Sequence, residues 1–318
     1  MGCSRRSPRP GRHCRNVSLQ KPEVVLKRLE WTVIRRLDGL LQGEYRTLFR
    51  GHGIDLADIR EYEPGDDVRY IDWNVSARMD TPYVRQYLED REVTAYFLLD
   101  LSPSVDFGTV NTLKRDQLVE FVAVLARLLT RHGNKIGAVL YAGKVERTIP
   151  AGSGRLQVLR LLNDIINLPR LQSAPYTSVF DLIEHALRTI KRRSVVFLVS
   201  DFFTAPGWER PLGMLARKHE VIAVRLEDPR EKELPDIGMV VMSDAETGES
   251  VHVDTHDAKF RKRFDAAVQK REAELRSAFS RSAVDVLTLS TEEDLVGAVL
   301  RFAALRKQRR ALRAAVAV

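Results

Sequence analysis

An aspartate and two serines at alternate positions carry oxygen atoms that can bind a divalent cation. Asp100, Ser102 and Ser104 directly follow an apolar run over residues 93–99, which is predicted to form a buried strand. The three side chains therefore leave the carboxyl end of that strand, the edge at which ligands bind in open α/β sheets. Carboxylate and hydroxyl oxygens suit a hard cation, so the spacing predicts a site for Mg²⁺, with Mn²⁺ as the alternative.

Two further loops can meet this strand end at the same edge. Thr177 precedes an amphipathic helix predicted over 179–190, and Asp201 follows a second apolar strand predicted over 195–199. Two carboxylates and three hydroxyls would offer direct and water-bridged contacts, and would leave the cation able to accept a carboxylate from a partner. Each residue also has a purely structural interpretation, because the aspartates can close turns and Thr177 can cap the helix.

Helical and strand patterns alternate after Asp100. Helices are predicted over 114–132, 156–168, 179–190, 211–219 and 257–280, strands over 136–141, 145–149, 195–199, 221–226 and 284–289, and a hairpin over 237–254. The alternation predicts an α/β fold with a doubly wound, mostly parallel sheet covered on both faces. A helix over 22–41 precedes it, followed over 43–92 by turns and short strands that predict a small β-rich subdomain. Thr291 is expected to cap a final helix.

Composition divides the chain into four parts. We expect a disordered basic tail over 1–20, the N-terminal helix and β-rich segment over 21–92, the α/β domain over 93–290, and a basic C-terminal helix and tail over 291–318. The net charge is +8, with basic residues concentrated at both ends. No aromatic residues are interleaved with them, which disfavours nucleic-acid binding.

Two features of the sequence bear on the cellular compartment of the protein. Cys3 and Cys14 are the only cysteines and both lie in the tail, so the fold does not depend on disulfides. No apolar stretch approaches the roughly 20 residues that span a bilayer, which predicts no transmembrane segment. We therefore expect a cytoplasmic protein, or one peripheral to the inner face of the membrane.

The sequence D-L-S-P-S at residues 100–104 resembles the D-x-S-x-S signature of von Willebrand factor type A domains. In that family the signature forms a metal-ion-dependent adhesion site (MIDAS), completed by a threonine and a distant aspartate. The resemblance implies a von Willebrand A-like, Rossmann-like fold in which Thr177 and Asp201 take those roles. The family's threonine loop usually reads G-G-T-D, whereas this chain has P-Y-T-S at 175–178, so Ser178 is the alternative to Thr177.

Residues 43–92 resemble a second pattern, the hallmark of domain-of-unknown-function family 58 (DUF58). The matching stretches are F-R-G-H-G at 49–53, D-I-R-E-Y-E-P-G-D-D-V-R at 58–69 and I-D-W-N-V-S-A-R at 71–78. That family joins this segment to a von Willebrand A-like domain, and the resemblance covers residues 40–290. It implies a working partnership with an AAA+ ATPase of the MoxR type. The chain has no G-x-x-x-x-G-K-[ST] loop, so ATP-driven work would come from that partner.

Charges of opposite sign are balanced within the DUF58 hallmark, and arginine pairs well with carboxylates. One interpretation is an ion-paired structural subdomain that folds around Trp73, Tyr62 and Tyr70. A second is a docking surface beside the metal edge, and a third is a carboxylate cluster for hydrolysis. The carboxylate cluster would consist of Asp66, Asp67 and Asp72. The candidate docking residues are Arg60, Asp66, Asp67, Arg69, Asp72, Trp73 and Arg78.

These observations favour a metal-dependent protein-interaction module rather than an enzyme. Its role would be that of an adaptor or chaperone-like partner of a MoxR-type ATPase, with a client that offers a carboxylate to the cation. Two alternatives remain open: a metal-dependent hydrolase, such as a nuclease, that uses the same ion, and a metal-free scaffold.

Overall fold

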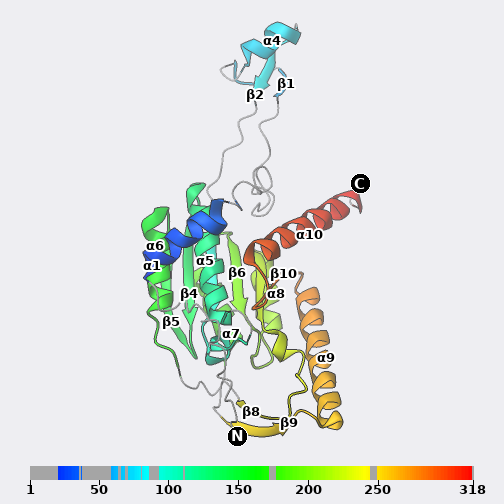
Figure 1. The fold of residues 1–318 in the computed structure, drawn as a ribbon. Coiled ribbons are helices and arrows are strands. Elements are labelled where there is room, and N and C mark those ends of the chain that lie inside the picture. The colour runs from blue at the N-terminus through cyan, green and yellow to red at the C-terminus, as the bar shows by residue number, and fades with distance from the viewer. Residues whose placement is uncertain are drawn as a thin grey trace, which may run out of the picture.

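A six-stranded sheet forms the centre of the molecule (Figure 1). The computed structural model describes residues 21–35, 37, 59–63, 66–68, 71–79, 81–85, 93–109, 112–171, 177–243 and 249–316. Within these residues the strand order of the sheet is β10-β7-β6-β3-β4-β5. The strands are β3 (Thr94–Asp100), β4 (Lys135–Tyr141), β5 (Val145–Gly152), β6 (Val195–Ser200), β7 (Glu220–Glu227) and β10 (Asp285–Ser290).

All neighbouring strands run parallel except β4 and β5, which form an antiparallel pair at one edge. Numbered along the chain from β3, the strands have the spatial order 3-2-1-4-5-6 of a doubly wound fold. The order reverses between β3 and β6, which are hydrogen-bonded neighbours. This confirms the predicted α/β, mostly parallel sheet. It also places the carboxyl ends of β3 and β6 at the point where the strand order reverses, the topological switch point. Sheets of this type bind ligands there.

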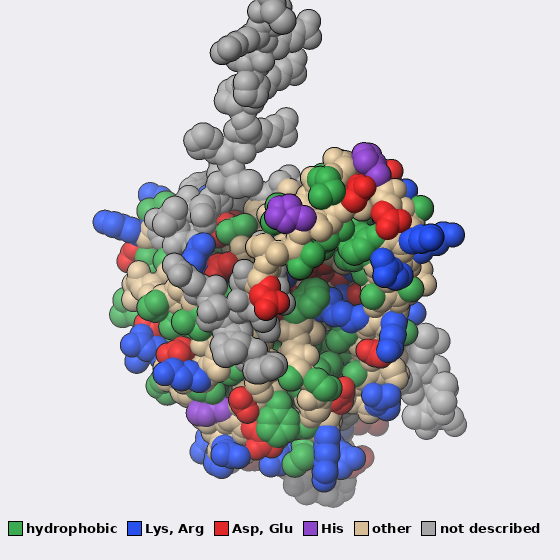
Figure 2. All heavy atoms as spheres, turned by 90° about the horizontal axis from the view of Figure 1, so that it is seen from below, with side chains coloured by type: hydrophobic (Ala, Val, Ile, Leu, Met, Phe, Trp, Pro, Cys, Tyr) green, Lys and Arg blue, Asp and Glu red, His purple; other side chains and the backbone are tan. Residues whose placement is uncertain are grey.

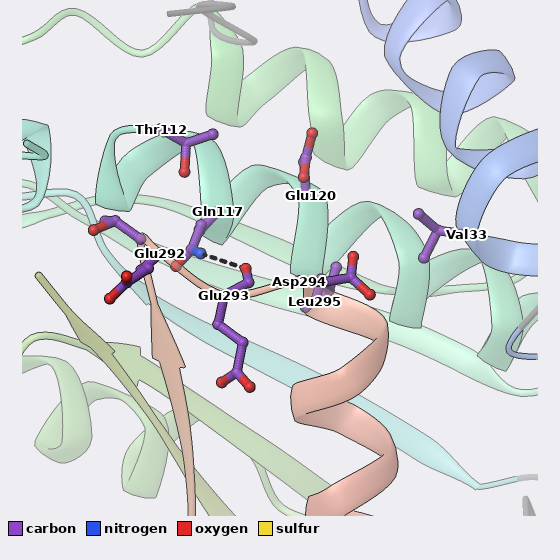
Figure 3. Close-up of a pocket in the computed structure, with 9 residues that line it drawn as sticks. Val33, Thr112, Gln117, Glu120, Glu292, Glu293, Asp294 and Leu295 are labelled. Carbon is purple, nitrogen blue, oxygen red and sulfur yellow. Dashed lines mark hydrogen bonds between the residues drawn. The ribbon is translucent and has the colours of Figure 1, made fainter. Parts of the chain in front are cut away.

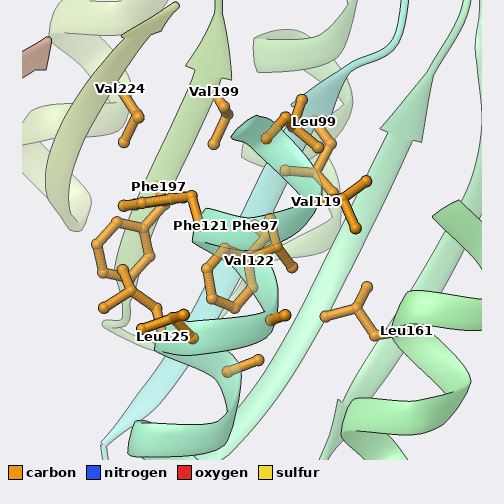
Figure 4. Packing of buried hydrophobic residues seen from close by; sticks show 14 of the residues in the cluster. Phe97, Leu99, Val119, Phe121, Val122, Leu125, Leu161, Phe197, Val199 and Val224 are labelled. Atoms are coloured by element: carbon orange, nitrogen blue, oxygen red, sulfur yellow. The ribbon is translucent and has the colours of Figure 1, made fainter. Parts of the chain in front are cut away.

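Helices cover both faces of the sheet, which explains why β3 and β6 are almost continuously apolar. One face packs against α1 (Pro22–Leu29), α5 (Lys114–Arg131), α6 (Gly154–Ile166) and the first half of α10 (Leu295–Val316). The other packs against α7 (Val179–Thr189), α8 (Glu209–Lys218) and α9 (Ala258–Arg281). On the first face Phe197 stacks on Phe97 with ring centroids 5.2 Å apart and meets Phe121 edge-on at 6.0 Å (Figure 4).

The predicted N-terminal helix begins at Pro22, where a proline suits the first turn, and continues as a π-helical stretch, η2 (Glu30–Ile34). Its buried face is apolar and includes Val25, Leu26 and Leu29. Val24 is 53% exposed, whereas Leu26 is buried. Arg28 reaches Glu120 of α5 at 2.5 Å, so ion pairing as well as apolar contact holds α1 on α5. The predicted end of the helix, beyond residue 37, lies outside the described residues.

The DUF58 hallmark segment contains two short antiparallel strands, β1 (Ile59–Glu61) and β2 (Tyr83–Arg85), and one short helix, α4 (Trp73–Met79). The helix was absent from the predicted β-rich segment. Its start is fixed by Asp72, which is buried and accepts a hydrogen bond from the Val75 amide at 3.3 Å. Trp73 is 70% exposed, so it is not a core residue of this segment, contrary to the interpretation in which the segment folds around it.

The carboxyl end of β7 leads into a short 3-10 turn, η5 (Pro229–Glu231), and then into the predicted hairpin, β8 (Met239–Ser243) and β9 (Ser250–Asp254). Thr291 does not cap the last helix, because α10 begins only at Leu295 and the Thr291 hydroxyl donates to Asp228 at 2.6 Å. None of the helices in the described ranges is long and apolar enough to cross a membrane.

Candidate metal centre

Asp100 ends β3 and is fully buried. Its Oδ1 accepts a hydrogen bond from the Ser102 amide at 3.1 Å, and its Oδ2 accepts one from the Ser200 hydroxyl at 2.6 Å. The chain then turns through a 3-10 helix, η4 (Pro103–Asp106), which brings the Ser102 and Ser104 hydroxyl oxygens within 3.1 Å of each other. The structure thus gathers all three oxygen-bearing side chains of the D-L-S-P-S motif at one strand end.

Asp201 follows β6 on the other side of the switch point and is also buried. Its Oδ1 accepts a hydrogen bond from the Phe203 amide at 3.0 Å. Between them, Phe202 has a φ of 57°, a left-handed conformation that a bulky side chain rarely adopts. The Phe202 ring packs on Trp208 and Phe279, with ring centroids 5.4 and 5.0 Å away, so aromatic contacts hold this turn in place.

The negative charge of Asp201 affects the Asp100 carboxylate. Burial, and next the negative charge of Asp201, raise the pKa of Asp100 from 3.8 to about 6. Hydrogen bonds from Ser200 and Ser102 only partly oppose this rise in pKa. Two carboxylates in one dry site are costly to ionise together, and a bound cation is the usual means of relieving that cost.

Thr177 and Ser178 lie in the loop before α7 and have different surroundings. The Ser178 hydroxyl caps α7 by accepting a hydrogen bond from the Asp181 amide at 3.2 Å, and the Ser178 amide donates to the Tyr141 hydroxyl at 3.0 Å. The Thr177 hydroxyl is buried and makes no hydrogen bond with any described residue. The Thr177 carbonyl accepts a hydrogen bond from Thr204 at 2.8 Å, which ties this loop to the one after β6.

Lys114 is a member of this site that the sequence patterns did not reveal. It is the first residue of α5, is fully buried, and places Nζ 2.6 Å from Asp201 Oδ2 and 2.6 Å from Glu231 Oε1. Burial lowers the pKa of Lys114, but the charges of Asp201 and Glu231 outweigh it, so the pKa is raised. One signal was available, because a lysine at a helix N-terminus opposes the helix dipole and calls for nearby carboxylates.

Arg271 of α9 completes the surroundings of Asp201. It donates to the Asp201 carbonyl at 3.1 Å, and its guanidinium lies 3.2 Å from the centroid of the Phe203 ring. This residue had no local sequence signal, because α9 is charged along most of its length.

Within the described ranges, no group of three or more His, Cys, Asp or Glu side chains could hold a metal ion. A cation at the switch point would therefore depend on the serine and threonine hydroxyls as well as on the two aspartates. Figure 2 views the molecule from the end where the β8–β9 hairpin lies, and it shows acidic and basic side chains interspersed over that face.

A pocket of about 300 Å³ lies elsewhere, between α5 and the start of α10 (Figure 3). None of the five candidate metal ligands lines it. Three of its carboxylates are already engaged, since Glu120 pairs with Arg28, Glu293 pairs with Arg301, and Asp294 accepts a hydrogen bond from the Gly297 amide. The residues that line this pocket therefore do not identify a ligand for it.

The candidate docking residues of the hallmark segment have mixed environments. Arg60 pairs with Asp66 at 2.6 Å, and hydrogen bonds from the Glu63 amide and from Arg60 lower the pKa of Asp66. Asp72 caps α4 through its hydrogen bond with the Val75 amide. Of the other candidates, Trp73 and Arg78 are exposed, Asp67 is half-buried, and Arg69 lies outside the described residues.

Similarity to known proteins identifies the family of this chain. The family described as "Protein of unknown function DUF58" matches residues 58–274. The chain belongs to the DUF58 family. A relative from Mycobacterium tuberculosis, "Uncharacterized protein Rv1480", is 36% identical to this DUF58 chain over 288 residues, which cover 91% of the chain and 90% of the relative.

Two solved structures are similar to the DUF58 chain in part. BatB from Bacteroides thetaiotaomicron is 13% identical, with a TM-score of 0.41 over 69% of this chain and 99% of that one. An aerotolerance-related membrane protein from Bacteroides fragilis is 12% identical, with a TM-score of 0.42 over 68% of this chain and 99% of that one.

Proposed function

We propose that this DUF58 protein is a metal-dependent protein-interaction module. The observation that carries the proposal is the Thr177 hydroxyl, which is buried without a hydrogen-bond partner among the described residues. A buried hydroxyl without a partner costs free energy, so such a group needs an explanation. It belongs to the loop that is tied by Thr204 to the turn after β6, where Asp201 lies.

The chemistry of the site fits a hard cation. Asp100, Ser102, Ser104, Thr177 and Asp201 would hold it, and their donor set consists of oxygens alone. Mg²⁺ suits such ligands best, with Mn²⁺ as an alternative. A bound cation would supply a strong positive charge with room for one further oxygen ligand. Ser178 is a poorer candidate than Thr177, since its hydroxyl already caps α7.

The partner would recognise the site through a carboxylate. With five oxygen ligands proposed for a cation that prefers six, a coordination position would stay open for an acidic side chain from another protein. We further propose a MoxR-type AAA+ ATPase as the working partner and an acidic client protein, with this chain as the adaptor between them. Trp73 and Arg78 are exposed on the hallmark segment and are suitable contacts for such a partner.

The test uses the full chain and a MoxR-type ATPase from the same genome. Calorimetric titration with Mg²⁺ and Mn²⁺ should show binding that Asp100→Ala abolishes. Pull-down of the ATPase should require the metal and fail with a chelator. Asp228→Asn is the matched control, because Asp228 is equally buried but lies outside the proposed ligand set. Pull-down that is indifferent to chelator and to Asp100→Ala would refute the proposal.

The same experiments separate the alternatives. No heat and no shift in melting temperature with either metal would favour a metal-free scaffold. Turnover of phosphodiester or ester substrates in Mg²⁺ or Mn²⁺, lost in Asp100→Ala, would favour a hydrolase.

A further inference from the structure

Lys114 links the proposed metal site to a neighbouring turn. Its ammonium bridges two carboxylates from different elements, Asp201 after β6 and Glu231 in η5 after β7. Glu231 is itself held in place, because its Oε2 accepts a hydrogen bond from the Asp228 amide at 3.1 Å. The rings of Phe107 and Phe203 lie 5.7 and 5.4 Å from the ammonium and help to exclude water from it.

The position of Lys114 is unfavourable by itself. A buried ammonium loses its hydration, and at the first position of α5 it also meets the positive end of the helix dipole. Both costs are offset only because two carboxylates lie at hydrogen-bond distance. Asp201 is thus already neutralised by a cation that belongs to the protein itself.

A divalent ion that uses Asp201 would come close to this ammonium, because both would contact the same carboxylate. Two positive charges a few ångströms apart in a site of low dielectric repel strongly. Glu231 offers the ammonium an alternative anchor, since it is 2.6 Å away and independently fixed.

We propose that Lys114 is a built-in competitor of the divalent cation. It neutralises Asp201 in the metal-free protein, and it shifts its pairing towards Glu231 when metal binds. Lys114 thereby sets the affinity of the site for the divalent cation. This inference rests on the proposed metal-binding function and adds the residue that regulates it.

The experiment is calorimetric titration of MgCl₂ and MnCl₂ into the full chain. Lys114→Met keeps the length of the side chain and removes its charge, so we expect the Kd for the metal to fall at least tenfold. Lys114→Arg retains the positive charge beside Asp201, so it should not show the tighter metal binding expected for Lys114→Met, even though its larger planar group fits the site differently. Lys144→Met is the matched control, because Lys144 is exposed in the β4–β5 turn and should change nothing.

Glu231→Gln is a second variant that tests the proposal if Lys114→Met does not fold, because Lys114 keeps Asp201 as a charged partner. We expect it to change the Kd for the metal in the opposite direction from Lys114→Met. It removes the alternative anchor, so metal binding should weaken. A purely structural ion pair predicts the reverse for Lys114→Met, since damage to the fold would weaken binding rather than tighten it.

Two results would overturn it. If the wild type binds metal through Asp100 and Lys114→Met has an unchanged or higher Kd, the inference fails while the proposed function stands. If neither the wild type nor Lys114→Met binds either metal, both fail together.

Discussion

Replacing Asp100 by asparagine should stabilise the metal-free protein. Burial and the charge of Asp201 raise the pKa of Asp100 from 3.8 to about 6. A raised pKa means that the folded state holds the proton more tightly than the unfolded state does. The contribution of Asp100 to stability is therefore favourable below pH 4 and is lost as the pH rises through 6. At pH 7 the ionised carboxylate costs the fold about 3 kcal/mol, at 1.36 kcal/mol per unit of pKa.

Asp100→Asn removes that charge but loses one acceptor, because only one of its two terminal atoms is an oxygen. Ser102 and Ser200 both donate to Asp100, so one hydrogen bond of about 1 kcal/mol is weakened. The net gain at pH 7 should be about 2 kcal/mol. Most of it should disappear at pH 4, where the wild-type carboxyl is protonated in the folded state.

The assay is denaturant unfolding in the presence of a chelator at pH 7 and pH 4, repeated with Mg²⁺ at pH 7. Asp228→Asn is the control. Asp228 is equally buried, and although burial favours its neutral form, hydrogen bonds from Thr109 and Thr291 lower its pKa. Asp228→Asn should therefore destabilise the protein at pH 7. Added Mg²⁺ should stabilise the wild type but not Asp100→Asn. The reasoning fails if Asp100→Asn is less stable than the wild type in chelator at pH 7.

Two further substitutions give distinct outcomes. Thr177→Val replaces a buried hydroxyl that has no partner among the described residues. In chelator it should leave the unfolding free energy unchanged or raise it by up to about 1 kcal/mol. Metal affinity measured by calorimetry should fall. A clear loss of stability in chelator would show that the hydroxyl has a structural partner. Trp73→Ala removes a side chain that is 70% exposed. It should change stability by less than about 0.5 kcal/mol but weaken pull-down of the ATPase, and unchanged pull-down would remove Trp73 from the docking surface.

Hydrophobic periodicity was sufficient to predict the sheet and the helices that cover it. β3 and β6 are buried on both faces and have continuous apolar runs, so few other structures suit them. The predicted helix over 114–132 corresponds to α5 (Lys114–Arg131) because its apolar stripe is long and regular. Connection rules then place the ends of β3 and β6 at one edge, which is why Asp100 and Asp201 could be expected together.

Short and polar segments were harder to predict. α4 has only seven residues and depends on a cap from Asp72, while its first residue, Trp73, has an exposed side chain that contributes little to packing. Thr291 has the residue type of a cap, yet its hydroxyl bonds to Asp228, which lies 63 residues away in the sequence. In both cases the deciding interaction involves one or two hydrogen bonds and leaves no periodic pattern.

The electrostatic role of an acidic residue at a strand end cannot be read from its type. Asp228, just after β7, receives four hydrogen bonds, from the Thr109 amide and hydroxyl, the Arg230 amide and the Thr291 hydroxyl. Asp100, at the end of β3, accepts hydrogen bonds from Ser102 and Ser200 only and has Asp201 as a like-charged neighbour among the described residues. The first carboxylate is stabilised by the fold, whereas the second costs the fold free energy. A buried charge that the fold leaves undercompensated is the one that a ligand can stabilise, so Asp100 rather than Asp228 is the position where binding energy is available.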